Sequence, residues 1–156
     1  MLDSDQEVVS QVAQSFGAYQ GPASPTFPTS GKWYEWEGKD IEEALLNLDP
    51  VDLRYEDLFI WERPLWSCMT TEGLLWLVPG LVRVIFEEVE RAGDQLLQDL
   101  FSVLQGRLGN GDLQLSPRQA KSLLNVYDVF YGREIFWRGP QHEQHPFCQS
   151  LDGLVD

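Results

Sequence analysis

The most apolar stretch of the chain lies near its middle, over residues 74–86. Only Pro79, Gly80 and Arg83 interrupt its large apolar side chains. A helix that is apolar on nearly every side packs against several neighbours, so we expect a central core helix over residues 70–91. Because proline lacks a backbone donor and disfavours helix at the preceding residue, this helix is predicted to kink at Pro79 or to restart with Pro79 in its first turn.

This central stretch supports narrower predictions. Thr70 or Thr71 is expected to cap the start of the helix, with Glu72 in the first turn. A membrane span needs roughly 18–20 apolar residues, so a shorter run with Arg83 inside it does not fit one. A buried arginine needs a carboxylate or carbonyl partner. We therefore expect Arg83 to pair with an acid on a neighbouring helix or to emerge at the kink.

Amphipathic patterns predict further helices on both sides of this centre. Apolar residues recur at i, i+1, i+4, i+5 and i+8 over residues 8–16 and 96–104, which is typical of one buried helical face. Asp5, Asp40 and Asp94 are the expected caps of three of these helices. Residues 51–59 carry a shorter helical pattern, with Asp52 or Asp57 as its expected cap.

The last long helix has a stronger start signal. Ser116, Pro117 and Gln119 form a capping box with proline at the first helical position, and Gly132 is expected to end the helix. In all, five to six helices and no convincing strand are predicted. The fold class is therefore all-α, a single compact helical domain over residues 1–156 around a Pro-kinked central helix. Residues 21–31 are expected to form a Pro-rich loop and residues 139–156 an irregular C-terminal tail.

Charge narrows the function classes. The formal net charge is −14, and no basic patch offsets it, so direct nucleic-acid binding is not expected. The acids concentrate in residues 35–62, where ten carboxylates face only Lys39 and Arg54, a net charge of −8. Such a field speeds encounter with a basic partner. Two cysteines, Cys68 and Cys148, and an acidic start without an apolar signal segment predict a reduced, cytoplasmic protein.

The search for chemistry yields one weak pattern. His142, His145 and Cys148 have the spacing H-x-x-H-x-x-C, and imidazole and thiolate are zinc ligands. Pro146 interrupts this segment, and the interpretation preferred is surface histidines with no metal. Glu87, Glu88 and Glu90 are interpreted as a solvated helix end. With no nucleophile or phosphate-binding motif, the prediction is that the protein is not an enzyme and takes no cofactor.

Several short patterns together resemble a known family. An aromatic residue precedes a proline within an apolar helix (Trp76 and Pro79), after a Trp-rich segment and Thr-x-Glu-Gly, and before Leu-Ser-Pro-x-Gln at the start of the last long helix. Over residues 33–131 the chain resembles a family of uncharacterised bacterial domains of unknown function. It departs from that pattern at Val78, where the family has leucine, and at Thr71, where it has proline. The resemblance implies a helical fold and a bacterial source, and it transfers no activity.

The favoured function is that of an acidic binding protein which neutralises a basic protein partner, most simply a toxin immunity protein. Aromatic and acidic side chains interleave in the acidic half of the chain, and aromatic residues are good hot spots in interfaces. The residues expected to bind the partner are Trp33, Tyr34, Glu35, Trp36, Glu37, Asp40, Glu42, Glu43, Asp57 and Trp61.

Three alternatives stay open. The same charge suits an acidic nucleic-acid mimic or phage-type inhibitor of a nucleic-acid enzyme, if the carboxylates are spaced like phosphates. A small enzyme with a cryptic site would be stabilised by a metal or metabolite. A scaffold subunit would use the apolar stripe of residues 8–16 as its contact. A monomer or small homo-oligomer without membrane contact is expected in each case.

Overall fold

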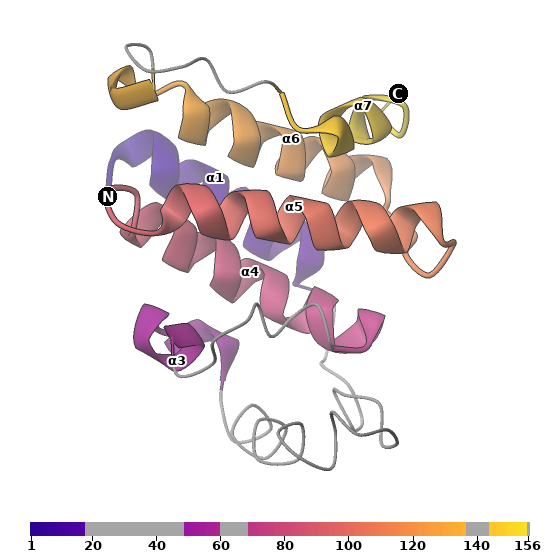
Figure 1. Cartoon of the computed structure of the whole chain (residues 1–156), viewed down its shortest axis with the longest axis horizontal. Coiled ribbons are helices and arrows are strands. Elements are labelled where there is room, and N and C mark those ends of the chain that lie inside the picture. The colour runs from indigo at the N-terminus through magenta and orange to yellow at the C-terminus, as the bar shows by residue number, and fades with distance from the viewer. Residues whose placement is uncertain (18–48, 60–68, 137–143, 156) are drawn as a thin grey trace.

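The computed structural model describes residues 1–17, 49–59, 69–136 and 144–155. In these ranges the chain forms α1 (Asp3–Phe16), the 3-10 helix η2 (Pro50–Asp52), α3 (Tyr55–Phe59), α4 (Thr71–Glu87), α5 (Gly93–Gly109), α6 (Pro117–Tyr131), the 3-10 helix η4 (Glu134–Phe136) and α7 (Pro146–Asp152) (Figure 1). No strand occurs among these residues, which confirms the all-α prediction. No helix in the described ranges is long and apolar enough to span a bilayer.

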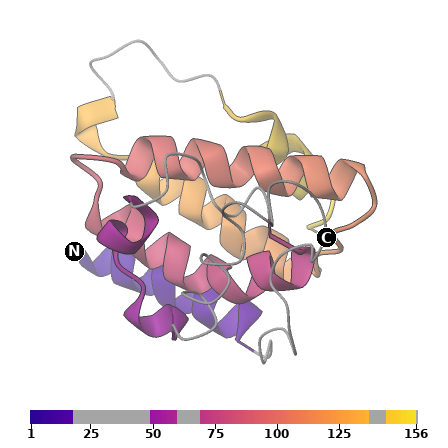
Figure 2. The same ribbon diagram turned by 60° about the horizontal axis from the view of Figure 1, so that its bottom comes forward.

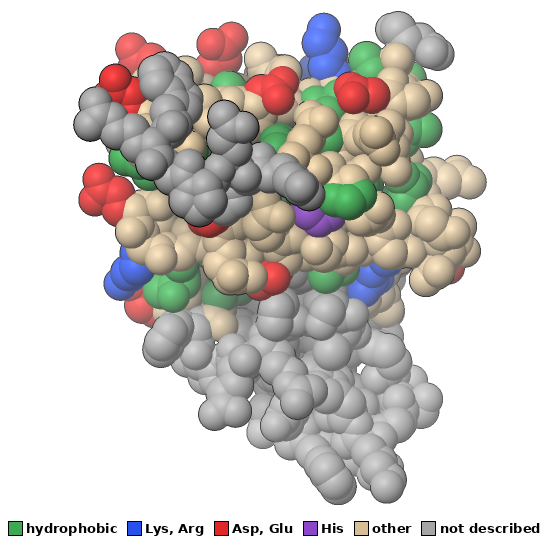
Figure 3. Space-filling model, turned by 45° about the horizontal axis from the view of Figure 1, so that its top comes forward, with side chains coloured by type: hydrophobic (Ala, Val, Ile, Leu, Met, Phe, Trp, Pro, Cys, Tyr) green, Lys and Arg blue, Asp and Glu red, His purple; other side chains and the backbone are tan. Residues whose placement is uncertain are grey.

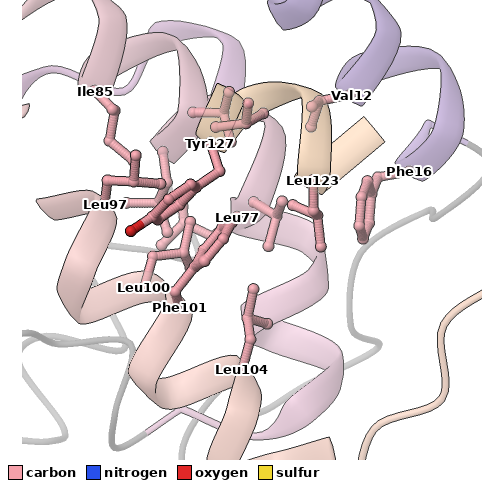
Figure 4. Close-up of a cluster of buried hydrophobic side chains, with 14 of the residues drawn as sticks. Val12, Phe16, Leu77, Ile85, Leu97, Leu100, Phe101, Leu104, Leu123 and Tyr127 are labelled. Carbon is pink, nitrogen blue, oxygen red and sulfur yellow. The ribbon is translucent and has the colours of Figure 1, made fainter. Parts of the chain in front are cut away.

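The central helix packs as its apolar sequence predicts. α4 contacts α1, α5 and η2, while α6 contacts α1 and α7, and α7 also contacts α5 (Figures 1 and 2). Side chains from α1, α4, α5 and α6 converge between these helices, as Figure 4 shows for Phe16, Leu77, Phe101 and Leu123. Burying this apolar surface is the dominant favourable term for the fold.

α4 runs without interruption through Pro79, so the predicted restart at this residue is wrong. A proline inside a helix costs about 3 kcal/mol, because it loses a backbone hydrogen bond and crowds the preceding turn. Here the residues on either side are fully buried, including Val78 and Leu81. Their packing holds the helix in one piece despite that cost.

Local sequence signals predicted two of the helix N-caps correctly and a third one wrongly. Thr70 caps α4, as predicted, by accepting a 3.1 Å hydrogen bond from the N–H of Gly73. The Ser116 capping box is confirmed, with reciprocal bonds of 3.0 and 3.1 Å to Gln119. The predicted cap of α1 is wrong by three residues, because Leu2 is the N-cap and the Asp5 carboxylate bonds back to its N–H.

The predicted cap of α5 is also wrong. Ala92 occupies the N-cap position, and the carboxylate of Asp94 instead accepts a hydrogen bond from the hydroxyl of Tyr131 on α6. Asp94 does lie in the first turn of the helix, where a negative charge is favourable. Its oxygen, however, is used to join two helices.

The predicted irregular tail over residues 139–156 is wrong where the structure describes it. Residues 146–152 form α7, whose Phe147, Cys148 and Leu151 are fully buried. Pro146 occupies the first turn, where a proline is tolerated because that N–H has no helical partner. The end of the chain is thus part of the core, packed on α5 and α6.

Candidate functional site

Most of the predicted partner-binding residues lie outside the described residues. This applies to Trp33, Tyr34, Glu35, Trp36, Glu37, Asp40, Glu42, Glu43 and Trp61. The remaining one, Asp57, lies half-buried in the first turn of α3. Its carboxylate accepts a 2.8 Å hydrogen bond from the N–H of Arg54. One oxygen of Asp57 therefore orders the start of α3.

The segment carrying η2 and α3 lies along the C-terminal half of α4. Arg83 of α4 donates to the backbone carbonyls of Leu53 and Pro50, and it also pairs with Glu87 of its own helix at 3.0 Å. The predicted pairing of Arg83 with an acid on a neighbouring helix is therefore wrong. A carboxylate one turn away and the carbonyls of Pro50 and Leu53 satisfy the guanidinium instead, and its side chain stays 24% exposed.

A second arginine fixes the far end of the same segment. Arg91, just after α4, lies with its guanidinium 4.5 Å from the ring centre of Tyr55 and 3.9 Å from the carboxylate of Glu56. It also bonds Glu88 at 2.8 Å. The hydrogen bond that Arg91 donates to Glu88, together with the charge of Glu88, raises the pKa of the Arg91 guanidinium. These contacts bring α3 to the acidic end of α4.

Two acidic stretches that are far apart in sequence thereby form one surface. We call it the acidic surface, and it comprises Asp49, Asp52, Glu56, Asp57, Glu87, Glu88 and Glu90, with Arg54, Arg83 and Arg91 among them. Seven carboxylates and three arginines give it a net charge of −4. From the sequence alone, the acids after Phe86 are predicted only to form a solvated helix end. No local pattern predicts that α3 lies beside them.

Two carboxylates of the acidic surface are exposed and uncommitted among the described residues. Asp52 and Glu90 make no ion pair there and cap no helix, whereas Asp49 accepts from the N–H of Val51. By contrast, Figure 3 shows the face at the top of Figure 1, where acidic side chains are spread singly among neutral ones. The acidic surface thus offers both fixed and free carboxylates at one end of the molecule.

The weak zinc pattern separates in the structure. His142 lies outside the described residues, while His145 is the buried N-cap of α7 and Cys148 lies within that helix. The Nδ1 atom of His145 caps α7 by accepting a 3.0 Å hydrogen bond from the N–H of Phe147. Burial raises the pKa of the Cys148 thiol to about 11, so it stays protonated. In the described part of the chain, no group of three or more His, Cys, Asp or Glu could hold a metal ion.

A serine and a histidine from distant segments do meet, which the sequence did not indicate. The Nε2 atom of His145 lies 3.0 Å from the Oγ of Ser102 on α5. Since Nδ1 accepts from a backbone N–H, Nε2 must carry the ring proton and donate to Ser102. A general base would need a free Nε2 lone pair. The serine hydroxyl donates to the carbonyl of Gln98, so this pair is a structural clasp and not a nucleophile with its base.

The clasp continues into a buried polar line across α5 and α6. The backbone N–H of His145 donates to the hydroxyl of Tyr127 at 2.9 Å, and Gln98 donates to the hydroxyl of Tyr131 at 2.7 Å. Tyr131 in turn donates to Asp94. Burial, followed by this bond to the carboxylate, raises the pKa of the Tyr131 hydroxyl well above its usual range. Each group thus has a partner, and the line holds α5, α6 and α7 together.

One ion pair joins a buried carboxylate to a largely buried arginine. Arg133, just after α6, donates to the carboxylate of Asp5 on α1, whose side chain is 2% exposed. The guanidinium also lies 5.8 Å from the ring centre of Phe86. The Oδ1 of Asp5 and the Nε of Arg133 have no hydrogen-bond partner among the described residues. Removing either partner would leave a charge buried without its counterpart, so the pair ties α1 to the end of α6.

A polar groove lies between α1 and α6, beside the contact between these two helices. Gln11, Ser15 and Gln14 pair with Asn125, Ser122 and Arg118 in turn, which shows that the two helices are antiparallel. The groove is about 180 Å³ and is lined by these six residues and Lys121. Among the described residues, no carboxylate belongs to this lining.

Comparison with known proteins identifies no relative, so the fold class is the only classification available for this molecule. No protein-family model, curated protein or solved structure matches the chain. The resemblance to an uncharacterised bacterial domain family therefore stays an expectation from the sequence. The structure describes an all-α molecule with an acidic surface, a buried clasp and a polar groove.

Proposed function

We propose that this protein is an acidic binding protein that neutralises a basic protein partner, in the manner of a toxin immunity protein. The observation that supports this most directly is the acidic surface, in which residues 49–57 and 87–90 lie together. Charge gathered in this way raises the rate of encounter with an oppositely charged protein. The proposal places the chain in the cytoplasm and asks for no catalysis.

The arrangement of the arginines supports binding over simple solvation. Arg83 and Arg91 neutralise part of the surface, but both also fix the η2–α3 segment onto α4. The uncommitted carboxylates therefore stand on a rigid base. A rigid base lowers the conformational entropy that a partner must overcome on binding.

The first experiment is a tagged pull-down from the native cell at low and high salt, followed by mass spectrometry. Charge attraction between exposed groups is screened over about 10 Å at 0.1 M salt, while a desolvated aromatic contact is not. One stoichiometric basic partner is expected at low salt. A toxin would support an immunity protein, and a nucleic-acid enzyme would support an acidic mimic or phage-type inhibitor. Absence of a protein partner at both salt concentrations would contradict the proposal.

Once a partner is known, the acidic surface is tested by reversing its uncommitted carboxylates. Asp52→Lys with Glu90→Lys should lower the association rate constant by about tenfold at low salt, because the attractive field is reduced. The matched control is Asp112→Lys with Asp152→Lys. These exposed acids stand on the α5–α6 connection and on α7, across the molecule from α3 (Figure 1). Equal rates for the two double variants would mean that the acidic surface is not the docking site.

A further inference from the structure

The groove between α1 and α6 differs in charge from the rest of the molecule. The whole chain carries a net charge of −14, yet the groove is lined by Arg118 and Lys121 and by neutral polar residues. Both cations are exposed, and neither forms an ion pair with a described carboxylate. A local excess of positive charge is therefore built on α6, close to the positive end of its dipole.

Three side chains of the groove, Arg118, Lys121 and Gln14, have N–H groups to donate to a ligand. A guanidinium can only donate, so the 3.5 Å contact between Arg118 and Gln14 fixes the amide of Gln14 with its oxygen toward the arginine. The NH₂ group of Gln14 is then left to donate elsewhere. Arg118 keeps further N–H groups, and Lys121 keeps three.

The floor of the groove is closed and ordered. The hydroxyl oxygens of Ser15 and Ser122 lie 2.8 Å apart, and each also has a carbonyl of its own helix in reach, Val12 at 3.2 Å and Gln119 at 2.8 Å. The side chain of Gln119 donates to the carbonyl of Ser15 at 3.2 Å. These bonds fix the spacing of α1 and α6 beneath the free donors. The groove is thus preformed, which lowers the entropy cost of binding.

We propose that the groove between α1 and α6 is a binding site for a small anion with a carboxylate or phosphate group. Arg118 and Lys121 would supply the charge, and the amide of Gln14 a neutral donor. Carboxylate and phosphate share the chemistry that this lining recognises, which is a cluster of oxygen acceptors carrying negative charge. A volume of about 180 Å³ suits a small molecule and not a folded partner.

The test is a nuclear magnetic resonance titration of the ¹⁵N-labelled full chain with inorganic phosphate and, separately, with succinate. Sodium chloride keeps the ionic strength constant and serves as the reference anion. Saturable shifts are expected in the side-chain NH₂ of Gln14 and the backbone amides of residues 118–125. Binding of phosphate alone would identify a phosphate site, and binding of succinate alone a carboxylate site. No saturation with either probe would overturn the proposal.

Substitutions locate the binding. Arg118→Gln and Lys121→Gln should each weaken it by about threefold, and the double variant by about tenfold, as for exposed charge pairs. Both side chains are exposed, so the variants should fold. Arg54→Gln removes an equal charge from an exposed residue outside the groove and should leave the affinity unchanged. If Arg54→Gln weakens binding as much as the groove variants, the shifts report general charge and the proposed site is wrong.

Discussion

Gly80 is the position at which a single hydrogen atom in place of a side chain lets two segments meet. A Cβ atom built there would lie 2.5 Å from the backbone oxygen of Pro50 and 3.4 Å from the side chain of Leu53. The first distance is far below van der Waals contact, and its partner is backbone, which cannot rotate away. Gly80 therefore carries the helix η2 directly against α4, within reach of Arg83.

We expect Gly80→Ala to lower the free energy of unfolding by about 1–3 kcal/mol, because overpacking forces a backbone shift. Urea denaturation measures this change. Gly106→Ala is the matched control, since that glycine lies inside α5 with nothing within 4 Å of its Cβ position. Alanine there should raise the stability by about 0.5–1 kcal/mol through helix propensity. A Gly80→Ala protein as stable as the wild type would show that η2 does not rest on this contact.

Single residues were predictable from sequence where their partners are close in the chain. The caps made by Thr70 and Ser116 each reach three positions along the helix, and both were found. The predicted acid partner of Arg83 and the predicted capping role of Asp94 are wrong, because their partners Leu53 and Tyr131 stand 30 and 37 positions away. A sequence shows that a polar group needs a partner, but only the fold selects which one.

At the scale of elements, α7 is attached by apolar contacts and by one histidine. Phe147 packs edge-on against Phe101 of α5, with ring centres 5.1 Å apart. His145 caps the helix and bonds Ser102, also on α5. Burial lowers the pKa of this imidazole from its ordinary value of 6.5. Its Nδ1 atom can accept from the N–H of Phe147 only while the ring is neutral, because protonation places a hydrogen on that nitrogen.

The attachment of α7 should therefore weaken in acid. With a lowered pKa in the folded state, the unfolded chain binds more protons as pH falls through 6.5, so the stability that His145 contributes is full above that pH and decreases below it. Urea denaturation between pH 7.5 and pH 5 measures the loss. Amide hydrogen exchange should show α7 opening before α6.

The control for this prediction is His145→Asn. Asparagine is a good N-cap, so it keeps an acceptor for the N–H of Phe147 without titrating in this range. The difference in stability between wild type and variant isolates His145, because every other titrating group is common to both. A difference that does not change with pH would contradict the proposed role of the neutral ring.

The long helices could be predicted from periodicity, whereas α7 could not. Seven residues make too few turns for an apolar stripe to be recognised, and Pro146 was interpreted as a breaker although it stands in the first turn. The sequence His145-Pro146 did carry a start signal, a side-chain acceptor followed by proline. Only one of the two stretches of the acidic surface could be predicted from the sequence. Its first stretch was visible as a charge run, but its union with residues 87–90 depends on how α3 packs.

At the scale of the whole molecule, the excess of acid opposes compaction. The net charge is −14. Among the described residues, four ion pairs offset part of the repulsion between the acids, and three of these pairs lie at the surface. Exposed pairs contribute little, about 0–1 kcal/mol each. Repulsion between like charges is then the larger electrostatic term in the folded state.

Raising sodium chloride from 10 to 150 mM is therefore expected to increase the thermal unfolding midpoint, because screening reduces repulsion more than it weakens the few ion pairs. A stabilisation of 1 kcal/mol corresponds to about 2–4 °C for a domain of this size. Differential scanning calorimetry measures the shift, and choline chloride as a second salt separates screening from sodium binding. A midpoint that falls with salt would mean that the ion pairs dominate.

The antiparallel contact of α1 with α6 has a consequence for the newly made chain. Ser15 and Ser122 meet across 107 positions of sequence. At about 5–20 residues per second, the ribosome needs roughly 5–20 s to deliver the second after the first. During that interval Val8, Val12 and Phe16, which are buried in the finished protein, have no α6 to cover them. For many seconds the nascent protein thus exposes the part of the apolar face of α1 that α6 later covers. Synthesis that stops before α6 would leave this face exposed, where chaperones could bind it or where it could aggregate.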